Sequence, residues 1–282
     1  MKKNGLYSLI NESPPANSRI LLVEDSAINR DVAIGIMKNA GYLSITVCIN
    51  GFEAIKMLEH ETFNLILMDI QMPEMDGFKA ASIVRDPTSH VLDHQAPIIA
   101  ITANATREDH QACMQAGMND YISKPFNPGK LISLLHKYCS VNNNPPAIQT
   151  DNTAAIQQSK NTIIDNEAFD YDGIMRRLLN DSELIETILC MFIKDSKMQI
   201  DILKKALTEK DLSKIILRAH TLKGASSNVG AEKLRTAAST IEVAARAGNT
   251  STIPDLIVQY EEEFEKFVNQ VRLHLPQLPL FN

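Results

Sequence analysis

The strongest constraint on the fold is an alternation of short apolar runs with longer segments of helical period between residues 19 and 140. The runs are ILLV, SITVC, FNLILM, PIIAIT and DYIS, and they are rich in the Ile, Leu and Val that buried parallel strands use. Strands that alternate with helices predict a parallel sheet covered by helices on both faces. We therefore expect an α/β domain with a doubly wound, five-stranded parallel sheet.

The pattern changes after this region, because apolar periodicity disappears and Asn, Pro, Gln and Thr accumulate. Such a composition is typical of a connector between domains. The amphipathic segments that follow lie near residues 170–179, 181–208, 211–228, 231–247 and 250–274. In the absence of strand signals, an antiparallel helical bundle is the simplest way to bury their apolar stripes. The predicted parts are an N-terminal extension (1–18), the α/β domain (19–140), a linker (141–163) and an all-α bundle (164–282).

Composition excludes several classes of function. The 282 residues carry a net charge of −6 and no Lys- or Arg-rich block, which disfavours direct binding to nucleic acid. The cysteines form no CxxC pair, which argues against a zinc site or a disulfide framework. No apolar stretch approaches the roughly 18 to 20 residues that a membrane-spanning helix needs. We expect a cytoplasmic protein with reduced thiols and no membrane segment in this chain.

Polar residues stand at the ends of successive apolar runs. Glu24 and Asp25 follow the first run, Asp69 ends the third, Thr102 ends the fourth and Lys124 follows the fifth. Because the carboxyl ends of parallel strands meet at one edge of a sheet, these side chains should converge there. Adjacent carboxylates are tolerable if a hard divalent cation such as Mg²⁺ supplies the countercharge. Without a metal, their repulsion should raise the pKa of at least one of them.

A simpler alternative is that these acids are helix caps and solvated loop charges. Asp25 stands before the sequence SAIN, where it is a candidate N-cap of the next helix. The order in which acid pair, Asp, Thr and Lys-Pro occur along the chain favours a common site over this alternative.

The stretches LLVEDS, LILMDIQMPEMDG, ITAN and DYISKPF follow one another as the motifs of a known family do. Through them, residues 19–140 resemble the receiver domain of two-component response regulators, which has a flavodoxin-like fold. The resemblance implies that Asp69 is the phosphoacceptor. It also implies that Glu24, Asp25, Asp69 and the backbone carbonyl of Gln71 bind Mg²⁺.

The same resemblance assigns the other conspicuous residues of this half. Thr102 is expected to bond the phosphoryl group and Lys124 to pair with it. Thr102 and Tyr121, which matches the mobile aromatic position of the family, are expected to form the switch. The Lys124–Pro125 peptide bond is expected to be cis.

The helical half contains a second unusual stretch, RAHTLKGASSNVGA. At about 100 degrees per residue, His220 falls about 130 degrees from the centre of the apolar stripe of its helix and should be an exposed imidazole. Leu217 and Gly224 lie on the same outward face, and Lys223 brings a cation close. The stripe consists of Leu212, Ile215, Ile216, Ala219, Leu222 and Ser226.

Gly224 is a second reason to consider this helix. A glycine in mid-helix costs roughly 1 kcal/mol relative to alanine, which indicates that another molecule approaches closely. Tight packing within the bundle is the alternative explanation. An ordinary solvated side chain is likewise the simpler reading of a surface histidine, but the neighbours of His220 favour a site.

The HxxKG pattern formed by His220, Lys223 and Gly224, continued by ASSNVGA, resembles the core of the His-containing phosphotransfer (HPt) domain. The resemblance covers about residues 165–275. It implies that His220 takes and gives the phosphoryl group through a ring nitrogen, while Lys223 offers its charge to the phosphoryl oxygens. Gly224 then admits the loops of a partner, and Leu217 contributes to docking. An imidazole suits this role because it is a neutral nucleophile near pH 7.

Together the halves predict a phosphorelay intermediate that accepts a phosphoryl group on Asp69 and carries one on His220. The chain contains no ATP-binding signature, so it needs a histidine kinase as donor and a response regulator as acceptor. The order of the domains resembles the C-terminal part of hybrid sensor kinases, and the sequence leaves open whether the chain is free-standing or part of one. Alternatives are a non-relay binding module switched by Asp69 phosphorylation and a Mg²⁺-dependent phosphohydrolase of small molecules.

Overall fold

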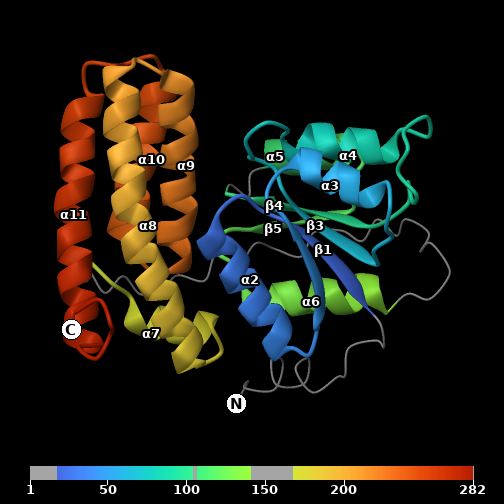
Figure 1. The fold of residues 1–282 in the computed structure, drawn as a ribbon, viewed down its shortest axis with the longest axis horizontal. Coiled ribbons are helices and arrows are strands. Elements are labelled where there is room, and N and C mark those ends of the chain that lie inside the picture. Colours follow the sequence, from blue (N-terminus) through green and yellow to red (C-terminus); the bar gives the residue numbers. More distant parts are fainter. Residues whose placement is uncertain (1–17, 104–106, 141–167, 282) are drawn as a thin grey trace.

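The computed structural model describes residues 18–103, 107–140 and 168–281 (Figure 1). Within them, the N-terminal half contains a five-stranded sheet in the order β2-β1-β3-β4-β5, and all of its pairs are parallel. This confirms the predicted doubly wound sheet. The strands are β1 (Arg19–Val23), β2 (Ser44–Cys48), β3 (Leu65–Asp69), β4 (Ile98–Thr102) and β5 (Asp120–Ser123).

Five helices cover the two faces of this sheet, α2 and α6 on one face and α3, α4 and α5 on the other (Figure 1). The chain winds from β1 outward to β2 and then returns past β1 to β3. The strand order therefore reverses between β1 and β3, which is where ligands bind in open α/β sheets. The helices are α2 (Ala27–Asn39), α3 (Gly51–Leu58), α4 (Gly77–Arg85), α5 (Arg107–Gln115) and α6 (Pro128–Cys139).

The C-terminal half is helical, as predicted, and its long helices form an antiparallel bundle (Figure 1). Asp181 and Asp211 begin α8 and α9 by accepting hydrogen bonds from backbone N–H groups of the first turn. The predicted stripe of α9 is buried at its centre, so the helical period gives the inward face correctly. The helices are α7 (Tyr171–Arg177), α8 (Ser182–Thr208), α9 (Leu212–Asn228), α10 (Glu232–Arg246) and α11 (Ile253–His274).

The two halves pack against each other through α2. This helix contacts α8 and α9 and lies beside them in Figure 1. One apolar cluster runs from the α2 and α6 side of the sheet into the bundle, and it joins Val32 of α2 to Ile185 of α8. The other face of the sheet has a separate cluster under α3, α4 and α5. The α2 side of the receiver-like half is therefore the side on which the bundle is docked.

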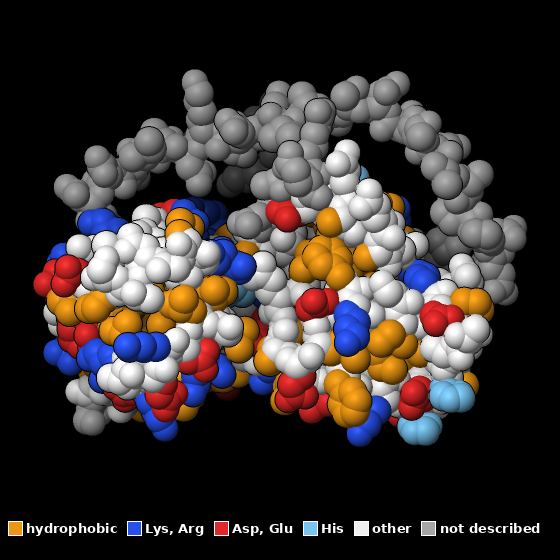
Figure 2. All heavy atoms as spheres, turned by 90° about the horizontal axis from the view of Figure 1, so that it is seen from above, with side chains coloured by type: hydrophobic (Ala, Val, Ile, Leu, Met, Phe, Trp, Pro, Cys, Tyr) orange, Lys and Arg blue, Asp and Glu red, His pale blue; other side chains and the backbone are white. Residues whose placement is uncertain are grey.

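The segments before and between the two domains are not part of the described structure. The predicted linker (141–163) lies outside the described residues, as does nearly all of the predicted N-terminal extension. Among the described helices, none is both long and apolar enough to cross a membrane. The face shown in Figure 2 carries acidic and basic side chains interspersed over both halves. All four cysteines are free thiols.

Candidate functional site

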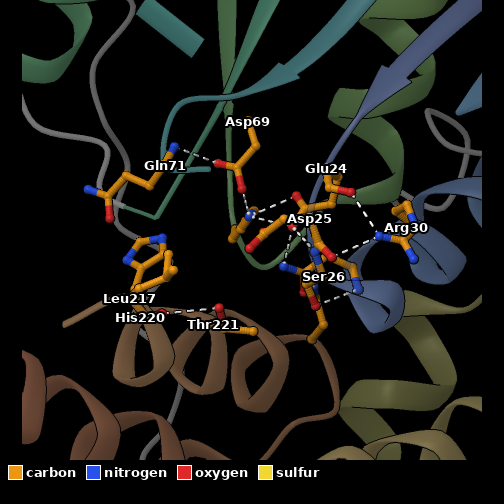
Figure 3. Close-up of polar contacts among 12 residues, drawn as sticks. Glu24, Asp25, Ser26, Arg30, Asp69, Gln71, Leu217, His220 and Thr221 are labelled. Atoms are coloured by element: carbon orange, nitrogen blue, oxygen red, sulfur yellow. Dashed lines mark hydrogen bonds and ion pairs between the residues drawn. The ribbon is translucent and has the colours of Figure 1, made fainter. Parts of the chain in front are cut away.

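The predicted convergence of polar side chains at the strand ends is present in the structure. Glu24 directly follows β1, Asp69 ends β3 and Lys124 directly follows β5, and all three are buried. The ammonium nitrogen of Lys124 lies 2.7 Å from Oδ2 of Asp69 and 2.8 Å from Oε2 of Glu24. Carboxylate oxygens of Glu24, Asp25 and Asp69 all lie within 4.8 Å of one another. Glu24, Asp25, Asp69 and Lys124 form the acid pocket, and its three acids are labelled in Figure 3.

The start of α2 holds the first two acids in place. Ser26, not Asp25, is the N-cap of α2, because its Oγ accepts a hydrogen bond from the backbone N–H of Asn29. The capping alternative for Asp25 is therefore wrong, and its carboxylate belongs to the pocket. Arg30 donates to the backbone carbonyls of Glu24 and Asp25 at 2.9 and 2.8 Å. Arg30 was not predicted from the sequence, since nothing in the motif shows that its side chain turns back on the preceding loop.

Burial and mutual repulsion perturb the carboxylates of the pocket. Burial, and then the charge of Glu24, raises the pKa of Asp25 to about 6. The same two causes raise the pKa of Asp69 above its ordinary value. Burial disfavours the ammonium of Lys124, but the charges of Asp69 and Glu24 outweigh it and raise the pKa of this lysine. The prediction of at least one raised carboxylate pKa is confirmed, although desolvation is a larger cause than repulsion.

The donor set of the pocket fits a divalent cation. Three carboxylates within reach of one point are ligands that a hard ion prefers. Oε2 of Glu24 is buried and lies close to the Lys124 ammonium, yet it accepts no hydrogen bond, so it has capacity for a further ligand. The backbone N–H of Gln71 donates to Oδ1 of Asp69 at 3.2 Å, which places Gln71 beside the pocket. The role of its carbonyl stays a prediction.

The other predicted residues of this half, Thr102 and Tyr121, lie in the neighbouring strands β4 and β5. Thr102 ends β4 and is buried. Tyr121 lies in β5 with its ring edge on His110, at 5.0 Å between centroids, and the Lys130 ammonium 4.2 Å above it. The Lys124–Pro125 bond is cis, as expected. The switch roles of Thr102 and Tyr121 stay predictions.

His220 does not have the solvent exposure that we expected. Only 6% of its side chain is accessible, so the prediction of an exposed imidazole is wrong. Figure 3 shows the ring on the side of α9 that faces Asp69 and Gln71. The helical period gave the direction of the side chain, away from the apolar stripe, but it contains no information about a second domain that covers this face. The described C-terminal half of α9 is accordingly buried on all sides.

Gly224 lies one turn beyond His220 and permits this close approach. A Cβ at position 224 would lie 3.3 Å from Nδ2 of Asn29 and 3.6 Å from Cδ of Lys124. The nearest neighbours thus belong to the α/β half and not to the bundle, which favours close approach over tight packing inside the bundle. Leu217 lies on the same stretch of α9 and is half-buried.

Glu242 of α10 is a functional candidate that was not predicted from the sequence. Its carboxylate lies 3.4 Å from Nδ1 of His220, 2.8 Å from the ammonium of Lys223 and 2.7 Å from a guanidinium nitrogen of Arg246. Burial disfavours the charged form of Glu242, but these donors outweigh it and hold its pKa well below the ordinary value. Nothing in the local pattern of α10 links Glu242 to a histidine of α9.

The electrostatics of this second cluster keep the imidazole neutral. Burial lowers the pKa of His220, the hydrogen bond that its ring makes to Glu242 opposes this, and the nearby charge of Lys124 lowers the pKa further. Because the Glu242 carboxylate can only accept, Nδ1 of His220 must be the donor. Nε2 is then the ring nitrogen with a free electron pair. Lys223, expected to serve the phosphoryl oxygens, is paired with Glu242 in this structure.

Comparisons with known proteins agree with this architecture. Residues 20–136 match the model of the response regulator receiver domain, and residues 187–273 match that of the Hpt domain. The sensor protein GacS of Pseudomonas syringae pv. syringae is 28% identical over 227 residues, which are 79% of this chain and 24% of that protein. The histidine-protein kinase BarA of Escherichia coli is 26% identical over 249 residues, 88% of this chain and 26% of that protein.

These two relatives are much longer, and the chain spans about a quarter of their length. An uncharacterized 14.6 kDa protein of Leptolyngbya boryana is 41% identical over 125 residues, 44% of this chain and 92% of that protein. Among solved structures, the receiver domain of the sensor histidine kinase PA1611 from Pseudomonas aeruginosa, with a coordinated magnesium ion, is 36% identical. That alignment covers 45% of this chain and 100% of the other, with a TM-score of 0.40.

The family models match in the order that the sequence predicted, and each falls on the fold that its family requires: the receiver model on the parallel sheet and the Hpt model on the bundle. The chain belongs to the two-component signalling proteins, as a response regulator receiver domain followed by an Hpt domain.

Proposed function

We propose that this chain is a phosphorelay intermediate in which Asp69 and His220 are successive carriers of one phosphoryl group. The observation that carries the proposal is the packing of the His220 face of α9 against the strand ends that hold Asp69 and Lys124. A histidine without a role has no reason to face the acid pocket of another domain. The domain boundaries at residues 18, 140 and 163 are part of the proposal.

In the receiver, Asp69 is the nucleophile toward an incoming phosphoryl group. Lys124 already contacts this carboxylate and, with Thr102, would neutralise and bond the peripheral oxygens of the transferred group. Glu24, Asp25, Asp69 and the backbone carbonyl of Gln71 would hold Mg²⁺, which adds countercharge to the phosphoryl oxygens. Thr102 and Tyr121 would change position when Asp69 is phosphorylated.

Transfer to the second carrier exchanges one bond to phosphorus for another. The electron pair of Nε2 of His220 forms the P–N bond, and the P–O bond to Asp69 breaks with its electron pair returning to the carboxylate. The proton on Nδ1 stays in place, so the product is a phosphoimidazolium whose positive charge the Glu242 carboxylate stabilises. Lys223 donates to Glu242 in this structure, and in the proposal its charge would serve the phosphoryl oxygens after transfer.

Exchange with other proteins completes the proposed relay. A histidine kinase would supply the phosphoryl group to Asp69, and a response regulator would receive it from His220. Leu217 and Gly224 would contribute to the surface on which receivers dock, since an apolar side chain and a gap in side-chain bulk border the imidazole. A cytoplasmic location fits these partners.

In the test, the full chain is incubated with Mg²⁺ and with acetyl phosphate that carries a radioactive phosphoryl group. The base-labile label is then separated from the acid-labile label. The wild-type chain should show both kinds, on Asp69 and His220 respectively. The variant Asp69→Asn should lose both, because it has no nucleophile for the acyl phosphate. The variant His220→Gln should keep only the base-labile label.

Matched controls are Asp201→Asn and His60→Gln, which change exposed residues of the same types. Both should label like the wild type. Base-labile label on Asp69 without any acid-labile label on the wild-type chain would contradict the relay. It would instead favour the module that is only switched by Asp69.

A further inference from the structure

A buried chain of amide hydrogen bonds crosses between the two domains. Asn29 of α2 donates from Nδ2 to Oε1 of Glu24 at 2.8 Å. Its Oδ1 accepts from Nδ2 of Asn228, the last residue of α9, at 2.8 Å. Oδ1 of Asn228 in turn accepts from the backbone N–H of Phe126 at 3.2 Å. Both asparagines are buried, with 1% and 0% of their surface exposed.

The direction of every bond in this chain is forced. The Lys124 ammonium donates to the Glu24 carboxylate, and Oε1 of that carboxylate also accepts from the NH₂ group of Asn29. The carbonyl oxygen of the Asn29 side chain then faces Asn228, which must donate from its own NH₂ group. The carbonyl oxygen of Asn228 is left for Phe126, whose backbone N–H can only donate. A flip of either amide would oppose two acceptors or two donors in a buried place.

The partners of the Asn228 side chain belong to the receiver, and they border the acid pocket on two sides. Asn29 holds the metal-ligand candidate Glu24, and Phe126 follows the Lys124–Pro125 pair in the loop after β5. The side chain of Asn228 therefore forms hydrogen bonds on two sides of the pocket, with Asn29 of α2 and with the backbone that follows Lys124 and Pro125. It does so from the helix that carries His220, two turns further along.

We propose that Asn228 is a positioning residue, by which the Hpt domain recognises its own receiver and sets the His220 ring against the acid pocket for transfer. This inference rests on the proposed relay function. The chemistry that it recognises is an asparagine at the start of α2 together with the backbone N–H after the Lys-Pro pair.

The test compares Asn228→Leu and Asn228→Asp with the wild type, in the full chain and in the acetyl phosphate assay with Mg²⁺. Leucine leaves Asn29 and the Phe126 N–H without partners, while aspartate keeps an acceptor for Phe126 but presents no donor to Asn29. We expect the ratio of His220 label to Asp69 label to fall about tenfold or more with leucine, the usual effect of leaving buried polar groups unpaired. Aspartate should lower the ratio as well.

A second measurement follows the contact itself. Hydrogen exchange at the Phe126 amide should be at least about tenfold faster in Asn228→Leu than in the wild type, because the amide loses its acceptor. The matched control is Asn39→Ala at the rim of the same interface. Asn39 is exposed and makes only a 3.5 Å contact with Asp181, so its removal should change neither readout.

The outcomes separate this inference from the relay itself. Wild-type label ratios in a folded Asn228→Leu or Asn228→Asp chain would overturn the positioning role, while loss of label in His220→Gln would still support the relay. If His220→Gln also kept its acid-labile label, the relay would fail first. Should leucine at position 228 prevent folding, the nearly isosteric aspartate variant decides, since both side-chain partners of residue 228 lie in the other domain.

Discussion

The acid pocket of the receiver and the histidine cluster of the bundle meet at one interface but bury charge very differently. In the pocket, three carboxylates share one ammonium, and desolvation raises the pKa of two of them, Asp25 and Asp69. In the histidine cluster, one carboxylate receives three donors and its pKa is lowered. The pocket has more carboxylates than cationic groups, whereas in the histidine cluster His220, Lys223 and Arg246 all donate to the single carboxylate of Glu242.

This difference shows where catalysis has to come from. A pocket with excess negative charge fits a cation, and Glu24, Asp25 and Asp69 would hold one that, with Lys124, would supply positive charge to a phosphoryl group. The histidine cluster offers a neutral nucleophile with its other nitrogen fixed by Glu242, and little that would polarise phosphorus. In the proposed relay, the receiver would therefore supply the electrostatics of transfer, and the bundle would supply a positioned acceptor.

Among variants that change the charges of these two clusters, Lys124→Met should have the largest effect. The change leaves buried carboxylates without their ammonium, and loss of one partner of a buried ion pair costs about 3–5 kcal/mol. We expect the free energy of unfolding of the full chain to fall by about 3 kcal/mol near pH 7.5. Mg²⁺ should restore a large part of it, since the metal supplies the missing countercharge. Urea unfolding with and without Mg²⁺ measures both effects.

The control for this prediction is Lys79→Met, which removes an exposed lysine of α4. Its unfolding midpoint should stay within error of the wild type. An Lys124→Met chain as stable as the wild type without Mg²⁺ would contradict the view that Lys124 is the countercharge of the pocket.

A smaller effect is expected on the histidine side. Glu242→Gln keeps the shape of the side chain but removes the charge that fixes Nδ1 of His220 as a donor. Hydrogen bonds to charged groups contribute about 1.5–3 kcal/mol, so transfer from Asp69 to His220 should slow about tenfold or more. Asp69 labelling should continue. Nitrogen-15 NMR of the imidazole should show a mixture of tautomers in place of one.

Glu262→Gln, an exposed change on α11, is the matched control and should leave both the NMR spectrum and the transfer rate unchanged. A single Nδ1–H tautomer in Glu242→Gln would show that something other than Glu242 orients the ring.

The smallest effect concerns pH. The pKa of His220 is lowered in the folded chain, chiefly by burial, so below its ordinary value of 6.5 the unfolded chain binds the extra proton first. The stabilising contribution of neutral His220 is therefore complete above pH 6.5 and is lost as the pH falls toward the folded pKa.

Asp25 opposes this trend, because its pKa is raised from 3.8 to about 6 by burial and Glu24, so that protonation between these values favours the folded chain. The measurement is therefore the difference in unfolding free energy between the wild type and His220→Gln, at pH 7.5 and at pH 5.5. The stability of the wild type relative to the variant should decline toward the lower pH. A difference that is constant with pH would contradict burial of a neutral imidazole.

The sequence alone determined the sheet, the helical stripes and the convergence of Glu24, Asp69 and Lys124. The sheet and the stripes depend on a local period of apolar residues, and the convergence depends on the rule that the carboxyl ends of parallel strands meet at one edge. Both can be recognised from residues that are close together in the sequence. The direction of His220 away from its stripe was predictable for the same reason.

Only the tertiary structure decided that His220 is buried, that Glu242 holds its ring and that Asn228 reaches Asn29. The two asparagines are 199 positions apart in the chain, and their hydrogen bond depends on how one folded domain lies on another. No local period encodes a contact of that kind, because the free energy of docking comes from complementary surfaces that exist only after each domain has folded.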